Sequence, residues 1–152
     1  MCLRIDRELA GGDASTLETL YRDLDDFWEQ SLLRHFRAES ECLLARLIRH
    51  VAIDDPLTER LSADHLRMAA LIADMRDTPA DRTDAIKAFG ALLRDHIKWE
   101  EEQLFEITQQ RLKKREMQAL GRELDARLPA ICFPNLWGPS GPPNKRSHNT
   151  GQ

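Results

Sequence analysis

The chain contains few of the residues on which disulfide-linked and β-rich proteins depend. Three of its 152 residues are cysteine and 6% are aromatic. Cys2, Cys42 and Cys132 are odd in number and widely spaced, which argues against a disulfide framework and against a Cys-x-x-Cys metal site. Cys42 is best explained as a small buried hydrophobe. Aromatic and β-branched residues, which strands favour, are scarce, so the composition is typical of amphipathic helices.

The chain has neither a surplus of positive charge nor a long apolar run. Its formal net charge is -4 with both signs interspersed, so it lacks the basic surface that nucleic-acid binding needs. No segment approaches the roughly 18 consecutive apolar residues of a membrane span. The first ten residues alternate between charged and apolar types, unlike a signal peptide. We therefore expect a soluble, cytoplasmic protein with no nucleic-acid partner and no membrane partner.

Apolar residues recur every three or four positions, the spacing that places them on one face of a helix. Glycine and proline interrupt this pattern after residue 10, near residue 55, near residue 78 and at Pro129. Helices are therefore expected at about 1–10, 13–51, 56–76, 80–112 and 114–127. We predict an all-α antiparallel bundle over residues 1–127 and a Pro/Gly-rich, largely disordered tail over 128–152.

Histidine and glutamate interrupt the apolar faces of three of these helices. His35 and Glu39 are four residues apart, as are His96 and Glu100, and His65 lies on the helix between the two pairs. Side chains four residues apart stand one turn apart on the same helix face. Apolar burial gives no reason to place such groups where leucine normally packs. A metal ion held between the helices would give one.

Each of these residues also has a simpler explanation. A histidine on an apolar face is commonly a hydrogen-bonded core residue, and an exposed His-x-x-x-Glu pair stabilises a helix by only about 0.2–0.5 kcal/mol. His50 and Asp54 match the same spacing, but they lie at a helix end and are expected at the surface. Two carboxylates buried without a cation would, however, cost several kcal/mol each. Imidazole with carboxylate favours iron, manganese or zinc over calcium, and glutamates that bridge two ions would allow a binuclear centre.

Three segments carry these residues, and together they resemble the hemerythrin-like, His-His-Glu cation-binding family. In order along the chain they are Leu-Leu-Arg-His-Phe-Arg-Ala-Glu-Ser-Glu, Ala-Asp-His-Leu-Arg-Met-Ala-Ala-Leu-Ile and Leu-Arg-Asp-His-Ile-Lys-Trp-Glu-Glu-Glu-Gln-Leu-Phe. The resemblance covers about residues 1–127. It implies a four-helix bundle around a non-haem, often binuclear, iron centre that binds oxygen, senses oxygen or nitric oxide, or reports iron.

The same resemblance implies a role for each of the five residues. His35 and Glu39 would be ligands from the second helix, His65 from the third, and His96 and Glu100 from the fourth. The two glutamates would be the bridging carboxylates. Iron, mononuclear or binuclear, is therefore the expected cofactor, with manganese and zinc as alternatives.

The chain departs from the family pattern at three positions. The first helix of the family normally supplies a histidine, yet no histidine precedes Gly11-Gly12-Asp13, so the first helix is expected to be shortened or the start to lie downstream of the true one. Ala69 stands where many members have a second third-helix histidine. Glu101 competes with Glu100 as the last carboxylate ligand. One metal position is therefore short of protein ligands.

We predict a metal-binding protein rather than an enzyme, with a metal ion and a small diatomic molecule as its ligands. Two alternatives stay open: a metal-free helical interaction module whose site has decayed, and a di-iron redox enzyme. The short first helix should also leave apolar surface uncovered, through which a homodimer would form.

Overall fold

A computed structural model describes residues 1–11, 13–52, 54–79 and 82–128. Within these residues every regular element is helical, which confirms the predicted all-α bundle with a short additional helix at its end. The first helix, α1, spans Cys2–Gly11, and the last, α8, spans Lys114–Arg127. Because residues 129–152 lie outside the described part of the chain, the disordered tail and its boundary stay predictions.

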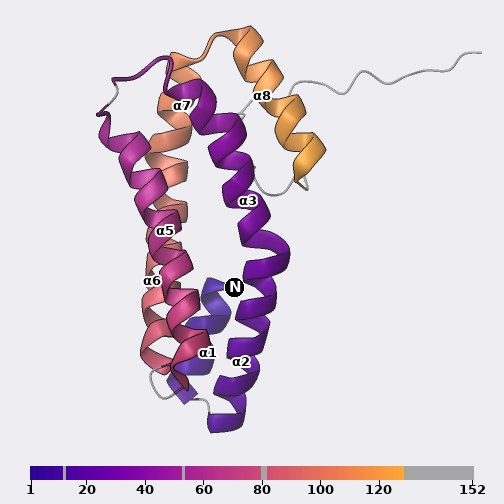
Figure 1. Ribbon diagram of the computed structural model, residues 1–152, viewed down its shortest axis with the longest axis vertical. Helices are drawn as coiled ribbons and strands as arrows, with labels where there is room; N and C mark the ends of the chain where they lie inside the picture. Colours follow the sequence, from indigo (N-terminus) through magenta and orange to yellow (C-terminus); the bar gives the residue numbers. More distant parts are fainter. Residues whose placement is uncertain (12, 53, 80–81, 129–152) are drawn as a thin grey trace, which may run out of the picture.

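The second helix of the bundle is one continuous rod built of five consecutive elements (Figure 1). These are α2 (Ala14–Phe27), η1 (Trp28–Leu32), α3 (Leu33–Ala38), η2 (Glu39–Leu44) and α4 (Ala45–Leu47). The third helix, α5, spans Pro56–Asp77 and returns antiparallel to it. The fourth consists of α6 (Arg82–Trp99), η4 (Glu100–Leu104) and α7 (Phe105–Arg111).

Two of the helices begin at an aspartate whose side chain caps the helix. Asp13 Oδ1 accepts a hydrogen bond from the backbone N–H of Thr16 at 2.8 Å, and so caps α2. Asp55 Oδ1 accepts one from the N–H of Leu57 at 2.9 Å, with Pro56 at the first position of α5. An acceptor at this position satisfies a backbone donor that the helix itself cannot pair, and proline there loses no hydrogen bond.

The elements η1, η2 and η4 are π-helical turns within otherwise α-helical rods. In η4 the N–H of Phe105 donates to the carbonyl of Glu100, five residues back. Such turns insert one extra residue into a helix and occur frequently at functional sites. Glu39 and Glu100 are the first residues of η2 and η4, so both predicted carboxylate ligands begin a π-helical turn.

The hydrophobic core consists of two clusters stacked along the long axis of the bundle. The lower cluster lies at the α1 end and contains Ile5, Leu20, Leu24, Trp28, Leu32, Phe36, Met68, Ile72, Met75, Ile86, Phe89 and Leu93. The upper cluster lies at the α8 end and contains Ala38, Cys42, Leu43, Leu47, Leu61, Trp99, Leu104, Phe105, Leu112, Leu120, Leu124 and Leu128. On each long rod the predicted metal ligands fall between the two clusters.

The short helices cover opposite ends of the bundle. α1 packs on α6 and α2, whereas α8 packs on α3 and η2 (Figure 1). Large exposed apolar side chains in the described residues are scattered over the rods, at Leu33, Ile48, Leu66 and Ile97. The homodimer stays a prediction. None of the described helices combines the length and the apolar character that crossing a bilayer demands.

Candidate metal centre

All five predicted ligands lie in the interior region between the two core clusters. His35 comes from α3, His65 from α5 and His96 from α6, while Glu39 and Glu100 begin η2 and η4. His96 is 1% exposed, Glu39 0% and Glu100 4%. Three separate rods therefore deliver imidazoles and carboxylates to the same level of the bundle.

The five side chains form short contacts with one another. His35 Nε2 lies 2.9 Å from Glu39 Oε1, and His65 Nε2 lies 3.1 Å from the other oxygen of that carboxylate. On the opposite rod, His96 Nε2 lies 3.2 Å from Glu100 Oε1. Glu39 thus joins the second and third helices, and one His–Glu pair faces it from the fourth.

Four of the residues offer donor atoms close enough together for one ion. One nitrogen or oxygen from each of Glu39, His65, His96 and Glu100 lies within 4.8 Å of all the others. His35 joins the set through its contact with Glu39. The spacing resembles that of donor atoms arranged around a common centre.

The hydrogen bonding of these donor atoms tests whether a metal fits. Within the described residues, some buried side-chain atoms of the cluster have no partner with hydrogen-bond geometry, even where two of them lie only about 3 Å apart. These atoms are Glu39 Oε1, Glu39 Oε2, His65 Nε2, His96 Nε2 and Glu100 Oε1. A buried polar atom without a partner is costly and rare. A transition-metal ion would accept all of these lone pairs at once, so the residues fit a metal.

The two carboxyl groups have pKa values shifted in opposite directions. Burial raises the pKa of Glu100 to about 8, with the charge of Glu39 adding to the shift and His96 opposing it. Burial also opposes ionisation of Glu39, but the charge of His35 and the short contacts with His35 and His65 together outweigh it and lower its pKa. In the metal-free protein at neutral pH, Glu39 is therefore ionised and Glu100 holds a proton.

Two of the histidines also have shifted pKa values. Burial lowers the pKa of His35, but the charge and close contact of Glu39, together with the charge of Glu100, outweigh it and the net shift is upward. The pKa of His96 is likewise raised, because Glu100, Glu39 and Asp64 together outweigh its burial. In both cases the neighbouring carboxylates favour the protonated imidazole.

A second layer of contacts holds the rings in place. Asp64 Oδ2 lies 3.2 Å from His96 Nδ1, which directs the other ring nitrogen, Nε2, toward the cluster. Arg60 Nε lies 3.5 Å from the same Asp64 oxygen. Phe36 stacks on His65 with ring centroids 3.9 Å apart and an angle of 13° between the planes. Sequence reasoning missed Asp64 and Phe36, although Asp64 directly precedes His65.

Other candidates considered from the sequence lie outside the cluster. Glu101 is exposed, whereas Glu100 faces the interior. Cys42 is a buried free thiol whose pKa is raised by burial, which confirms the prediction of a small buried hydrophobe. His50 was expected at the surface but is half-buried, because its Nε2 lies 2.9 Å from Glu116 Oε1 of α8.

Comparison with known proteins gives one match. The model of the hemerythrin HHE cation-binding domain matches residues 1–108, which include all five clustered residues. A search of curated proteins and a search of solved structures each gave no match. This domain implies binding of a metal cation, typically iron. The His/Glu cluster could hold that metal. The chain belongs to the hemerythrin HHE cation-binding domain family.

Proposed function

We propose that this protein binds non-haem iron through His35, Glu39, His65, His96 and Glu100. The observation that supports the proposal is the convergence of five buried donor atoms without hydrogen-bond partners from Glu39, His65, His96 and Glu100. Hydrogen bonding within the described residues does not account for these atoms, whereas a metal ion would. Glu100 rather than Glu101 is the proposed carboxylate because only Glu100 is buried in the cluster.

The arrangement favours one well-supplied ion and a second, less complete position. Glu39, His65, His96 and Glu100 would surround the first ion. A second ion beside His35 would share Glu39, and α1 (Cys2–Gly11) contains no histidine to offer it. Iron at such a site supplies an open coordination position for a small molecule and an accessible change of oxidation state.

The proposed role is to bind or sense oxygen, nitric oxide or iron supply. The open side of the second position gives a diatomic molecule a place to bind, and the histidines and glutamates around it are held by packed helices. A cytoplasmic location is part of this proposal, since Cys42 is a free thiol, as is usual in reducing compartments.

Metal content per chain tests the proposal. Protein expressed in iron-supplemented medium should contain one to two iron ions per chain by elemental analysis, and His96→Ala should remove most of them. His50→Ala is the matched control, because His50 is a half-buried histidine bound to a glutamate outside the cluster. Equal losses from both variants would contradict the ligand assignment.

The outcome also separates the remaining alternatives. A stable adduct with oxygen or nitric oxide would support sensing, whereas rapid consumption of peroxide or ferrous iron would indicate the redox enzyme. A colourless, iron-free protein would overturn the proposal. It would favour the metal-free interaction module. The raised pKa of Glu100 and the lack of a histidine in α1 also favour that alternative.

A further inference from the structure

Two imidazoles of the cluster are held in different ways. His96 has a carboxylate behind it, because Asp64 Oδ2 lies 3.2 Å from its Nδ1. His65 makes its short polar contact through Nε2, which lies 3.1 Å from Glu39 Oε2. Within the described residues, no protein group forms a hydrogen bond or ion pair with the other nitrogen of this ring, Nδ1. Metal-binding histidines usually donate that second N–H to a fixed acceptor, so the orientation of His65 needs another explanation.

An aromatic ring covers one face of His65. The rings of Phe36 and His65 have centroids 3.9 Å apart and an angle of 13° between their planes, so they lie face to face. Phe36 also meets the ring of His96 edge-on, with centroids 5.8 Å apart and an angle of 78°. Phe36 is 6% exposed and closely packed. Turning the imidazole about its Cβ–Cγ bond would drive its edge into the phenyl ring, so the stack restricts the direction of Nε2.

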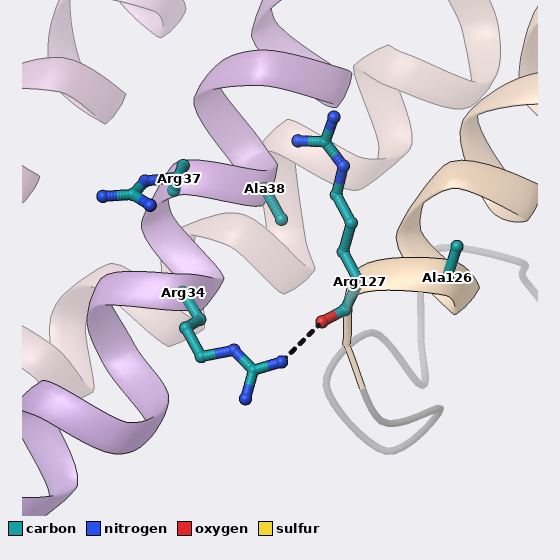
Figure 2. A pocket seen from close by; sticks show the side chains of 5 residues that line it. All are labelled: Arg34, Arg37, Ala38, Ala126 and Arg127. Atoms are coloured by element: carbon teal, nitrogen blue, oxygen red, sulfur yellow. Dashed lines mark hydrogen bonds between the residues drawn. The ribbon is translucent and has the colours of Figure 1, made fainter.

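Phe36 is itself held in place because α3 has contacts on both of its sides. Arg34 and Ala38 are four residues apart and lie on the side of α3 that meets α8 (Figure 2). Arg34 Nη2 donates there to the carbonyl of Arg127 at 3.4 Å. Phe36 follows Arg34 by two residues, about 200° around the helix, and so lies on the side that faces the core. There it meets Trp28 edge-on, with centroids 5.8 Å apart. The phenyl ring is therefore fixed by the fold without any help from a metal.

We propose that Phe36 is a positioning residue for the metal centre, whose ring holds the imidazole of His65 in the orientation in which Nε2 faces the cluster. This proposal rests on the proposed metal binding and adds a residue on which the affinity depends. Phe36 has no donor atom for a metal, so its effect passes through His65. A side chain that is ordered before the metal arrives loses less freedom on binding. Loss of the phenyl ring should therefore weaken metal binding about three- to tenfold.

The affinity of the full-length protein for ferrous iron, measured without oxygen by competition with a chelator, tests the proposal in Phe36→Leu. Phe89→Leu is the matched control, because Phe89 belongs to the same core cluster and also meets Trp28 edge-on, with centroids 6.3 Å apart. Among the described residues, Phe89 stacks on no histidine of the metal cluster. Both variants open a similar gap in the core, but only Phe36→Leu should weaken iron binding.

A double-mutant cycle shows whether the effect passes through His65. On the His65→Ala background, Phe36→Leu should cause no further loss of iron affinity, because the ring that it positions is gone. Equal losses of affinity in Phe36→Leu and Phe89→Leu would mean that loosening of the core is the cause, and would overturn the proposal. An undiminished effect of Phe36→Leu in the absence of His65 would also overturn it.

The metal-free protein gives a second readout that does not depend on iron. In NMR spectra of the histidine rings, the ring protons of His65 should be shifted upfield, because they face a phenyl ring. This shift should disappear in Phe36→Leu and persist in Phe89→Leu. A parent protein that shows the shift but binds no iron would overturn the proposed function, while supporting the orientation of His65 by Phe36. His65 signals that are the same in the parent and in Phe36→Leu would overturn the positioning role, whatever the iron content.

Discussion

Glu39 and Glu100 are the two residues whose burial most needs an explanation. Both are nearly inaccessible, and they lie close enough for the charge of Glu39 to raise the pKa of Glu100. Two ionised carboxylates in one apolar interior would repel each other and would each lack solvation. Protons solve this problem in the metal-free protein, and a cation would solve it in the loaded one. The metal-binding chemistry therefore follows from the energetics of two side chains.

Asp64 gives a prediction at the same scale, because it holds a ligand without belonging to the cluster. Replacing it by asparagine keeps the size of the side chain but removes the charge that orients His96 through Nδ1. We expect Asp64→Asn to weaken iron binding about 10- to 100-fold, the usual effect of losing such a partner. The measurement is the iron dissociation constant by competition with a chelator.

A structural role alone would change the stability of the metal-free protein instead. We expect the urea midpoint of metal-free Asp64→Asn to stay close to that of the parent, because Asp64 is partly exposed. Asp74→Asn, at an exposed position of α5, serves as the control and should leave iron affinity unchanged. Equal affinities for Asp64→Asn and the parent would show that His96 needs no partner.

At the residue scale, the sequence predicted the members of the His/Glu cluster better than it predicted the residues that contact the cluster from outside. The helical period places His35 with Glu39 and His96 with Glu100 on single faces, and the structure brings both pairs together with His65. The Asp64–His96 contact depends on how far α5 is shifted along α6, which the period of either helix does not contain. The choice of Glu100 over Glu101 likewise depends on the π-helical turn that begins there.

At the element scale, the ends of the helices were easier to predict than their interiors. Asp13, Asp55 and Pro56 act through local hydrogen bonds and a fixed backbone angle, so the sequence pattern was sufficient. The π-helical turns η2 and η4 have no comparable local signature. We infer that packing of the ligand-bearing faces against the neighbouring rods decides where the extra residue is accommodated.

The attachment of α1 gives a prediction at this scale. Gly90 of α6 faces Ile5 of α1, and a Cβ added to Gly90 would lie 3.0 Å from Cγ2 of Ile5. Ile5 is 1% exposed and has little room to move. We expect Gly90→Leu to lower the free energy of unfolding by about 1–3 kcal/mol, because overpacking outweighs the better helix propensity.

Urea unfolding and amide hydrogen exchange measure this effect together. Exchange should accelerate in α1 more than in α8, which packs at the other end of the bundle. Ala91→Leu is the matched control, since it adds a similar side chain at the exposed neighbouring position. If both variants lose the same stability, close packing of Gly90 on Ile5 is not what holds α1.

At the scale of the whole molecule, the metal cluster separates two hydrophobic cores. The lower core includes α1 and the upper core includes α8, and each long rod passes through both. Polar groups at the junction weaken the cohesion of the bundle unless they are neutralised. A metal that binds only the folded state would therefore join the two halves and raise the stability of the entire chain.

The pH dependence of the metal-free protein follows from this junction. Because the pKa of Glu100 is raised to about 8, the folded state binds a proton there between pH 4.5 and 8 that the unfolded state releases. Its unfolding free energy should therefore fall as pH rises across that window, by on the order of 1 kcal/mol per pH unit. The raised pKa values of His35 and His96 act in the same direction, since their stabilisation is lost as pH rises through the folded pKa. The lowered pKa of Glu39 acts only below about pH 4.5, where its stabilisation is lost on acidification.

Urea titrations of chelator-treated protein at pH 5, 6.5 and 8 measure this slope, with Glu100→Gln as the control. Glutamine resembles the protonated acid in shape and cannot ionise, so the variant should show a flatter pH dependence and the larger relative stability at pH 8. The same substitution removes a charged group from the proposed ligand set, so the iron content should fall while the metal-free fold is strengthened. Stability and metal binding would then change in opposite directions, which neither general misfolding nor a purely structural Glu100 produces. A parent protein whose metal-free stability is constant from pH 5 to 8 would show that Glu100 is ionised without a cation, and the electrostatic reason for placing a metal there would be lost.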